Sequence, residues 1–162
     1  MTDFRELLRC LNAAEVRFIL VGGMAAIAHG ATRLTQDVDI VYARDSENLR
    51  RLAEALRPYQ PYLRGVPQGL PFIWDEETLR RGLNFTLTTK IGDLDLLGEI
   101  VGGGGFTALE KHSIILDVFE MPCPCLGLTK LIEVKRAAGR PKDLEAIAEL
   151  EIIAQQSNSS SE

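Results

Sequence analysis

The spacing of apolar residues changes along the chain, and in its first third it predicts helices packed on a sheet. Residues 3–14 carry apolar side chains at helical intervals behind Thr2 and Asp3, either of which can cap the helix. Residues 16–21 are the first predicted strand, because residues 18–21 form an apolar run that is typical of a buried strand. Residues 46–57 again have helical spacing, so the chain returns to a helix after the region between them.

The middle of the chain predicts a loop, a short helix and an antiparallel pair of strands. Residues 57–71 are rich in proline and glycine, and a long loop in a compact domain is often functional. Residues 75–81 begin with acidic side chains and favour a helix. Residues 84–89 alternate in polarity and residues 91–97 continue through a tight turn into a second strand, which together indicate a hairpin.

The next segments alternate between breakers and apolar runs. The four glycines of residues 102–105 predict a flexible connection, because no Gly-Lys-Ser/Thr follows them as a phosphate-binding Walker loop requires. Residues 106–111 favour a short helix and residues 113–119 a buried strand. Residues 121–125 (MPCPC) are predicted to lie outside regular secondary structure, because each proline lacks a donor N–H.

The C-terminal part predicts two helices. Thr129 is placed to cap a helix over residues 130–138, and Gly139 to end it. Residues 143–155 carry apolar side chains at helical spacing and form the last predicted helix. We therefore expect a single domain over residues 1–155 and a disordered tail, rich in serine, over residues 156–162.

One stretch, residues 18–41, organises the candidate chemistry. The apolar strand ends at Gly22-Gly23, where backbone can approach a ligand closely, and residues 24–29 suit a short helix. Gly30 stands where a glycine commonly ends a helix. Residues 37–41 (DVDIV) then predict a second strand.

The second strand carries two carboxylates. Because successive strand residues point to opposite faces, Asp37 and Asp39 share one face. Two such carboxylates repel each other, and a divalent cation removes the repulsion; Mg²⁺ is typically held by one or two carboxylates and by substrate phosphate oxygens. Free N–H groups at Gly22-Gly23 would bind the phosphate. The order of motifs therefore indicates metal-assisted chemistry on a nucleoside triphosphate.

The same order of motifs resembles the signature of the DNA polymerase beta-like nucleotidyltransferase superfamily, in its minimal and AbiEii-like toxin branches. The resemblance rests on Gly22-Gly23, His29-Gly30, Arg33, Thr35 and the D-x-D of residues 37–39. Many members have serine as the second residue of the glycine turn. This chain has glycine there, so a hydroxyl donor to phosphate is missing and the backbone donors must suffice.

The resemblance implies a fold of the α/β (α+β) class: the polymerase-beta-type nucleotidyltransferase fold, a mixed sheet with flanking helices and a helical C-terminus. In that family a third acidic residue on a neighbouring strand completes the metal site. Asp95, between Leu94 and Leu96, fits that place, and an unpaired carboxylate in a core is costly. Asp93 is the alternative, but we assign it to the turn.

A further resemblance covers residues 135–143, where a lysine and a following acidic residue are associated with the active site of AbiEii-like relatives. Carried over, Lys135 would neutralise phosphate charge and Asp143 would orient it, with Arg140 in support. The alternative is a corner between two helices whose charged residues face solvent.

The resemblance assigns the following roles. Asp37, Asp39 and Asp95 hold Mg²⁺, or Mn²⁺, and Asp95 serves as the base for the attacking hydroxyl. The amides of Gly22 and Gly23 hold phosphates, and Arg33 or Lys135 offsets the phosphate charge. Thr35 orients the D-x-D segment rather than touching substrate.

Composition narrows the class of protein. The chain has 162 residues, 46% of them hydrophobic, and a net charge of −5, which argues against a general nucleic-acid binder. Two clusters of basic residues are interpreted as solvated faces: one contains Lys130, Lys135, Arg136, Arg140 and Lys142, and the other Arg50, Arg51, Arg57 and Arg64.

The three cysteines form neither a disulfide framework nor a zinc pattern. No signal peptide or bilayer-spanning run is evident, so we expect a cytoplasmic protein without a membrane partner.

Two hypotheses of function follow. The first is an enzyme that transfers a nucleoside monophosphate from an NTP to an acceptor, which in the relatives is tRNA, a partner protein or a small molecule, in some cases within a toxin–antitoxin pair. The small size favours a partner protein, or a homodimer that completes the site. The second is a degenerate member that binds nucleotide or a partner without catalysis.

Overall fold

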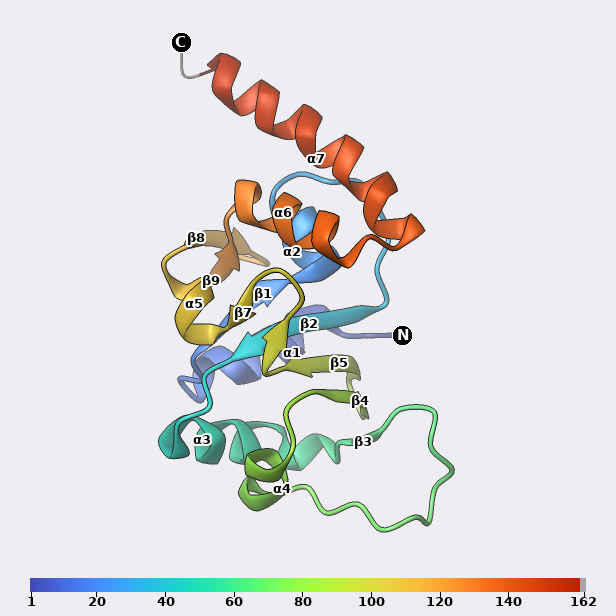
Figure 1. Cartoon of the computed structure of the whole chain (residues 1–162). Helices are drawn as coiled ribbons and strands as arrows, with labels where there is room; N and C mark the ends of the chain where they lie inside the picture. Colours follow the sequence, from blue (N-terminus) through green and yellow to red (C-terminus); the bar gives the residue numbers. More distant parts are fainter. Residues whose placement is uncertain (161–162) are drawn as a thin grey trace.

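The computed structural model describes residues 1–160, which form a mixed α/β fold around one strongly twisted sheet (Figure 1). The order of strands in this sheet is β3-β4-β5-β2-β1-β9-β8. The strands are β1 Phe18–Val21, β2 Asp37–Tyr42, β3 Tyr62–Leu63, β4 Phe85–Thr89, β5 Gly92–Leu97, β8 Ser113–Val118 and β9 Met121–Leu126, and a separate small hairpin joins β6 Glu99–Ile100 to β7 Gly104–Gly105. The mixed sheet with flanking helices confirms the predicted fold class.

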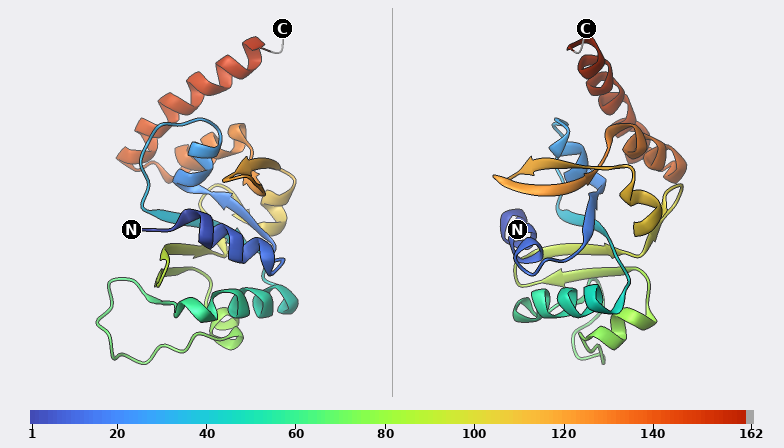
Figure 2. Two further views of the ribbon diagram at one scale, coloured as in Figure 1. Left: turned by 180° about the vertical axis from the view of Figure 1, so that it is seen from behind. Right: turned by 90° about the vertical axis from the view of Figure 1, so that its left-hand side faces the viewer.

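Several helices lie at the two ends of the sheet, α1 and α5 lie beside its central strands, and the last helix projects away from it (Figures 1 and 2). They are α1 Phe4–Ala13, α2 Gly22–Ala28, α3 Ser46–Leu56, the 3₁₀ helix η1 Arg57–Tyr59, α4 Glu76–Arg81, α5 Phe106–Glu110, α6 Leu128–Ala138 and α7 Pro141–Ser160. Figure 2 shows α3 and α4 beyond β4, and α2, α6 and α7 at the opposite end. Within residues 1–160 no helix is both long and apolar enough to cross a membrane.

Several helix boundaries follow from local capping chemistry. The Asp3 side chain accepts a hydrogen bond from the Glu6 backbone N–H and caps α1. Gly139, at φ +66°, ends α6 in the left-handed conformation that glycine adopts without strain. The predicted cap at Thr129 is wrong: α6 begins at Leu128, after Gly127, so Thr129 lies inside the first turn.

In the part of the sheet formed by β2, β5 and β4, one face is apolar and the other is polar. Val38 and Ile40 on β2, with Leu94 and Leu96 on β5, are fully buried in the core. Residues that pair across neighbouring strands share a face, and the register joins Asp37 to Asp93 and Asp39 to Asp95, then Asp93 to Thr88 and Asp95 to Thr86. The opposite face is therefore polar, and it carries four aspartates side by side.

The strand β9 corrects the prediction that residues 121–125 lack regular structure. It pairs antiparallel with β8 along its whole length and parallel with β1 at Leu20 and Cys125. Pro122 and Pro124 are two residues apart, so their nitrogens face the same neighbouring strand. The pairing of β9 with β1 spans a single residue pair. When both prolines face β1, the strand therefore loses few backbone hydrogen bonds.

Three other segments also differ from the prediction. β8 lies at the edge of the sheet, and Ile114 and Ile115 are 45% and 66% exposed, so it is not a buried strand. Residues 102–105 close the β6–β7 hairpin instead of forming a flexible connection. The loop over residues 57–71 contains η1 and β3, which pairs with β4. Of these elements, β3 pairs with a strand that lies far along the chain, which local patterns do not reveal.

The C-terminal segment continues further as a helix than predicted. The sequence predicts a disordered tail from residue 156, whereas α7 extends to Ser160. After Gln155 the sequence has no proline or glycine to interrupt the helical hydrogen bonds. The last two residues of the expected tail, 161 and 162, lie outside the described residues.

Candidate active site

Three carboxylates converge where β2 and β5 run side by side. Asp37 and Asp39 alternate on β2, and the parallel register places Asp95 of β5 directly beside Asp39. One ligand oxygen from each of the three lies within 4.8 Å of the others. The structure therefore brings together the three aspartates that the sequence singled out, in an arrangement that a single cation can bridge.

The negative charge of this triad is only partly compensated. The pKa of Asp39 is raised to about 8, mainly by burial and to a smaller extent by the negative charges of Asp37 and Asp95. Burial also raises the pKa of Asp95, although nearby Arg64 opposes the shift. Among the described residues, Oδ1 of Asp39 and Oδ1 of Asp95 are buried and accept no well-aligned hydrogen bond, although Arg64 Nη2 lies 2.9 Å from Asp95 Oδ1. Carboxylate oxygens are the donors that Mg²⁺ or Mn²⁺ prefers, and Asp39 Oδ1 is buried without a hydrogen-bond donor, so these residues fit a divalent metal.

The glycine pair at the start of α2 is held against the triad. Gly22 has φ +67°, and a Cβ atom built on it would lie 2.1 Å from Asp39 Oδ2. A Cβ atom on Gly23 would lie 2.9 Å from Thr35 Oγ1. The Thr35 hydroxyl in turn contacts the Asp37 carbonyl at 3.2 Å and Oδ1 of the Asp37 carboxylate at 3.3 Å. Thr35 is thus positioned to orient Asp37. The lack of space beside Thr35 for a Cβ atom is a reason for glycine at position 23.

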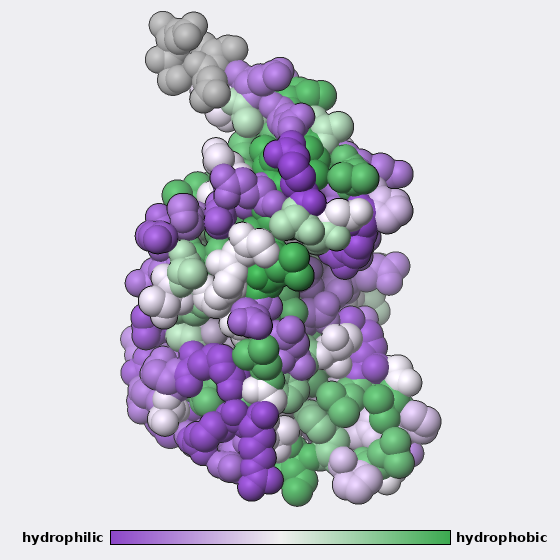
Figure 3. Space-filling view, viewed as in Figure 1, coloured by the Kyte–Doolittle hydropathy of each residue, from purple (hydrophilic) through white to green (hydrophobic). Residues whose placement is uncertain are grey.

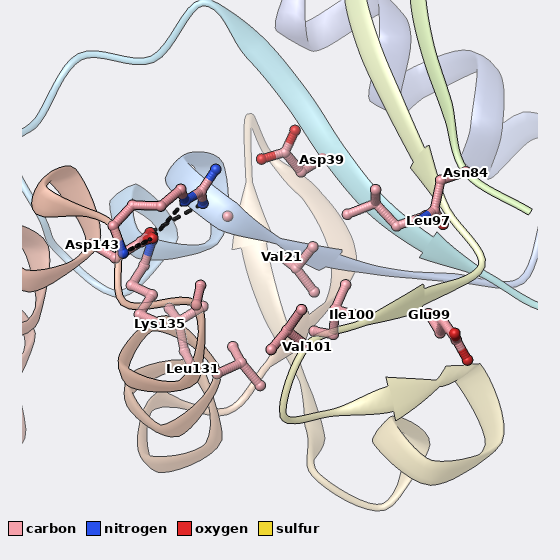
Figure 4. A pocket seen from close by; sticks show the side chains of 14 residues that line it. Val21, Asp39, Asn84, Leu97, Glu99, Ile100, Val101, Leu131, Lys135 and Asp143 are labelled. Carbon is pink, nitrogen blue, oxygen red and sulfur yellow. Dashed lines mark hydrogen bonds and ion pairs between the residues drawn. The ribbon is translucent and has the colours of Figure 1, made fainter.

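A pocket of about 410 Å³ opens on the Asp39 side of the triad (Figure 4). Its polar lining includes Asp39 and Lys135, together with Asn84, Glu99, Arg140 and Asp143. The remainder is mostly apolar, with Val21, Ile100, Val101 and Leu131 pointing into the space in the close-up view. The pocket is lined by Val21, Gly22, Asp39, Asn84, Leu97, Glu99, Ile100, Val101, Leu131, Val134, Lys135, Ala138, Arg140 and Asp143.

The charged residues of the corner between α6 and α7 line this pocket. Arg140 Nε contacts Oδ2 of the buried Asp143 at 2.6 Å, and the Arg140 backbone N–H donates to the same oxygen at 3.2 Å. Burial raises the pKa of Asp143, but the hydrogen bond and charge of Arg140 outweigh it, so the pKa is lowered. Burial lowers the pKa of Lys135, and the charges of Asp143 and Asp39 oppose that shift. The corner therefore faces the pocket, and the alternative that its charges all face solvent does not hold for Lys135 and Asp143.

A family model described as "Nucleotidyl transferase AbiEii toxin, Type IV TA system" matches residues 6–126, which include the glycine pair and all three carboxylates. The chain belongs to the AbiEii nucleotidyltransferase family. No curated protein sequence shows significant similarity to it.

Solved structures support the same fold for this AbiEii-family protein. The lincosamide antibiotic adenylyltransferase LnuA, determined with lincomycin bound, is 17% identical, with a TM-score of 0.62 over 94% of this chain and 98% of its own. TM1012 of Thermotoga maritima, a candidate nucleotidyltransferase, is 14% identical, with a TM-score of 0.50 over 98% and 96% of the two chains. At these identities the likeness shows the fold alone, which is that of a nucleotidyltransferase.

Arg33, which the resemblance offered to offset phosphate charge, is not among the residues that line the pocket. Its Nη1 pairs with Glu145 Oε2 of α7 at 3.4 Å, and its side chain is 42% exposed. Lys135, by contrast, lines the pocket with Asp39. Of the two basic residues that the AbiEii resemblance offered to offset phosphate charge, Lys135 is therefore the one that lies at the site.

The residue that sequence reasoning missed is Arg64, which was assigned to a solvated basic cluster. It follows β3 and contacts Asp37, Asp93 and Asp95, with the nearest distance 2.9 Å from Nη2 to Asp95 Oδ1. Asp93 is likewise corrected: it belongs to β5 and pairs with Arg64 Nε at 3.4 Å instead of serving a turn. Only the pairing of β3 with β4 brings Arg64 to this face, and no local motif marks it.

Proposed function

We propose that this AbiEii-family protein is a metal-dependent nucleotidyltransferase that moves a nucleoside monophosphate from an NTP to an acceptor. The observation that carries the proposal is the triad of Asp37, Asp39 and Asp95, in which the buried Asp39 Oδ1 has no hydrogen-bond donor, beside a pocket that contains Lys135. An arrangement that only stabilised the fold would not gather three carboxylates with a single neighbouring guanidinium, that of Arg64, to offset their charge.

The triad has two sides, and we assign one substrate to each. Asp39 lines the pocket together with Gly22 and Lys135, whereas Asp37 and Asp95 face β4 and Arg64. We place the NTP in the pocket, with its phosphates near the backbone N–H groups of Gly22 and Gly23 and near Lys135. The apolar wall is suited to the nucleoside, and the acceptor hydroxyl then approaches from the Asp95 side.

In this mechanism the acceptor oxygen forms a bond to the alpha-phosphorus while the bond to the leaving pyrophosphate breaks. Asp95 accepts the proton of the attacking hydroxyl. Lys135 offsets the charge that develops on the pyrophosphate, and Arg140 with Asp143 holds the corner that presents Lys135. Bound to the three aspartates, Mg²⁺ or Mn²⁺ would stabilise charge on the attacking and leaving oxygens. Thr35 keeps Asp37 in its orientation.

The experiment uses each alpha-labelled NTP with the protein, Mg²⁺ and a total cell extract. Label should enter one acceptor fraction, which is RNA, protein or small molecule, and it should disappear with the Asp37→Asn, Asp39→Asn double variant. Asp117→Asn is the matched control, because it removes an exposed carboxylate on β8, far from the triad in the sheet order. That control should transfer label at the wild-type rate.

The fraction that carries the label identifies the acceptor class. Label in tRNA or in protein would suit a toxin of a toxin–antitoxin pair, as the family description suggests, and a protein acceptor would include a partner protein or a second copy of this chain. Label in a small molecule would parallel LnuA, whose structure contains lincomycin. Transfer by the double variant at the wild-type rate would contradict the proposal.

A second candidate is a module that binds nucleotide or a partner without catalysis. It is favoured by Gly23, since this position offers no hydroxyl to phosphate. Such a module would show metal-dependent nucleotide binding but no labelled product with any NTP. Its partner would also remain bound to the Asp37→Asn, Asp39→Asn variant, whereas the enzyme would lose both metal binding and turnover.

A further inference from the structure

Arg64 is the one guanidinium among residues 1–160 that forms ion pairs with the aspartates of the polar sheet face. Its nitrogens lie 3.7 Å from Asp37 Oδ2, 3.4 Å from Asp93 Oδ2 and 2.9 Å from Asp95 Oδ1. Two of these three partners belong to the triad. A single positive charge is therefore shared among three carboxylates on neighbouring strands β2 and β5.

The backbone fixes this guanidinium in place. The Arg64 N–H donates to the Thr86 carbonyl at 3.0 Å and extends the β3–β4 pairing by one residue. Its Nη2 group donates to the Leu87 carbonyl at 2.6 Å, which ties the end of the side chain to β4. Only 27% of the Arg64 side chain is exposed, so the guanidinium is held on the β4 side of the triad and does not extend into solvent.

The contacts to the carboxylates act mainly through charge. Arg64 Nε and Asp95 Oδ1 are both buried and, within the described chain, neither makes a well-aligned hydrogen bond, although Asp95 Oδ1 lies 2.9 Å from Nη2. A fork that was built to bind one carboxylate would pair with it through two aligned N–H groups. This guanidinium instead lies between several carboxylates, as a general counter-ion does.

We propose that Arg64 is a fixed internal counter-ion of the triad, which stabilises the three carboxylates in the metal-free protein and opposes the binding of a divalent cation to them. The inference rests on the proposed function in one respect, namely that the triad binds metal. Arg64 is a positioning residue in this scheme, because it acts through Asp37 and Asp95 and not on the reacting atoms.

The physical reason is that Arg64 and a metal ion compete for the same negative charge. Without metal, the guanidinium relieves the repulsion among Asp37, Asp93 and Asp95. With metal, a divalent and a monovalent cation lie near each other at a half-buried site, and their repulsion weakens the binding. The metal then binds strongly only when the phosphate oxygens of an NTP add further negative ligands.

The test compares Arg64→Gln with the wild type in two measurements without nucleotide. In EDTA, thermal unfolding of Arg64→Gln should occur roughly 3–8 °C lower, because the carboxylates lose their counter-ion. In calorimetric titration with Mn²⁺ alone, the same variant should bind on the order of tenfold more tightly, because one competing charge is gone. Opposite signs in the two measurements are the signature of a counter-ion.

Two further variants make the result specific. Arg64→Lys keeps the charge, so its Mn²⁺ affinity should remain within about twofold of the wild type even if its melting temperature falls. Arg50→Gln makes the same change in net charge on the exposed face of α3, where Arg50 pairs with Glu47 and Glu54. It should leave the Mn²⁺ affinity unchanged.

A purely structural role would lower the melting temperature of Arg64→Gln and also weaken Mn²⁺ binding, and that result would overturn the inference. Unchanged values in both measurements would overturn it as well. Neither measurement depends on nucleotide transfer. A protein that binds Mn²⁺ but transfers no label would contradict the proposed function. The changes in melting temperature and in Mn²⁺ affinity of Arg64→Gln would still decide the counter-ion inference.

Discussion

Gly22 lies against the carboxylate of Asp39 so closely that no side chain fits between them. A Cβ atom at position 22 would be 2.1 Å from Asp39 Oδ2, and the backbone of Gly22 is at φ +67°. The contact joins the first turn of α2 to the middle of the triad. Position 22 therefore has two separate reasons to be glycine, the backbone conformation and the room that Asp39 requires.

We expect Gly22→Ala to destabilise the protein and to weaken its metal binding. The left-handed conformation costs an alanine roughly 1–2 kcal/mol, and the contact with Asp39 adds to this. Gly139→Ala is the matched control, because Gly139 has φ +66° but its Cβ would meet its nearest atom, the Arg136 carbonyl oxygen, at 3.6 Å. Urea unfolding and Mn²⁺ titration of both variants separate the two causes. Equal losses of stability with unchanged Mn²⁺ affinity would contradict the expectation.

Gly23→Ser should not improve the enzyme, although many relatives carry serine at this position. Its Cβ atom would meet Thr35 Oγ1 at 2.9 Å and Thr35 Cβ at 3.0 Å, which displaces the residue that orients Asp37. We expect a loss of about 1–2 kcal/mol in the free energy of unfolding, as for other overpacked positions. Gly23→Ala should show the same loss, since the Cβ atom causes it. A gain in transfer rate for Gly23→Ser alone would refute this reasoning.

Asp39→Asn should raise the stability of the metal-free protein while it removes function. Asp39 is buried beside Asp37 and Asp95, and an amide of similar shape relieves that repulsion. We expect the melting temperature in EDTA to rise by about 2–5 °C, equivalent to 1–2 kcal/mol. The exposed substitution Asp117→Asn should change it by no more than about 1 °C. A fall in melting temperature for Asp39→Asn would show that the carboxylate stabilises the fold.

The pair of Arg140 and Asp143 should make stability depend on pH. The pKa of Asp143 is lowered in the folded protein, so its stabilising effect is present above the unfolded value of about 3.9 and is lost as pH falls through the folded value. At pH 7 we expect Asp143→Asn to cost about 1–3 kcal/mol, as for other hydrogen bonds to charged groups. Urea unfolding at pH 7 and pH 3 should show this difference shrinking at the lower pH.

A double-mutant cycle tests whether the same pair is responsible. Arg140→Gln alone should cost less than Asp143→Asn, because the Arg140 side chain is 60% exposed while Asp143 is buried. The two substitutions together should cost less than the sum of the single losses. Additive losses, or a difference between wild type and Asp143→Asn that is constant from pH 7 to pH 3, would assign the stability to other contacts.

The sequence alone was enough to predict the part of the site that is local in the chain. A strand, a glycine pair, a short helix and a strand with alternating aspartates are set by short-range rules, which include the period of two along β2 and the lack of a side chain at Gly22. These rules predicted that Asp37 and Asp39 share a face, and the family resemblance added Asp95. The same kind of local rule misled us at β9, where two prolines pointed to an irregular segment.

Only the tertiary structure decided which distant residues meet the triad. The parallel pairing of β2 with β5 places Asp95 beside Asp39 and brings Asp93 onto the same face. The pairing of β3 with β4 places Arg64 beside the carboxylates. The packing of α7 places Glu145 beside Arg33. The physical reason is the same in each case: strand order and helix docking depend on burying the whole apolar core, and no single segment of the sequence contains that information.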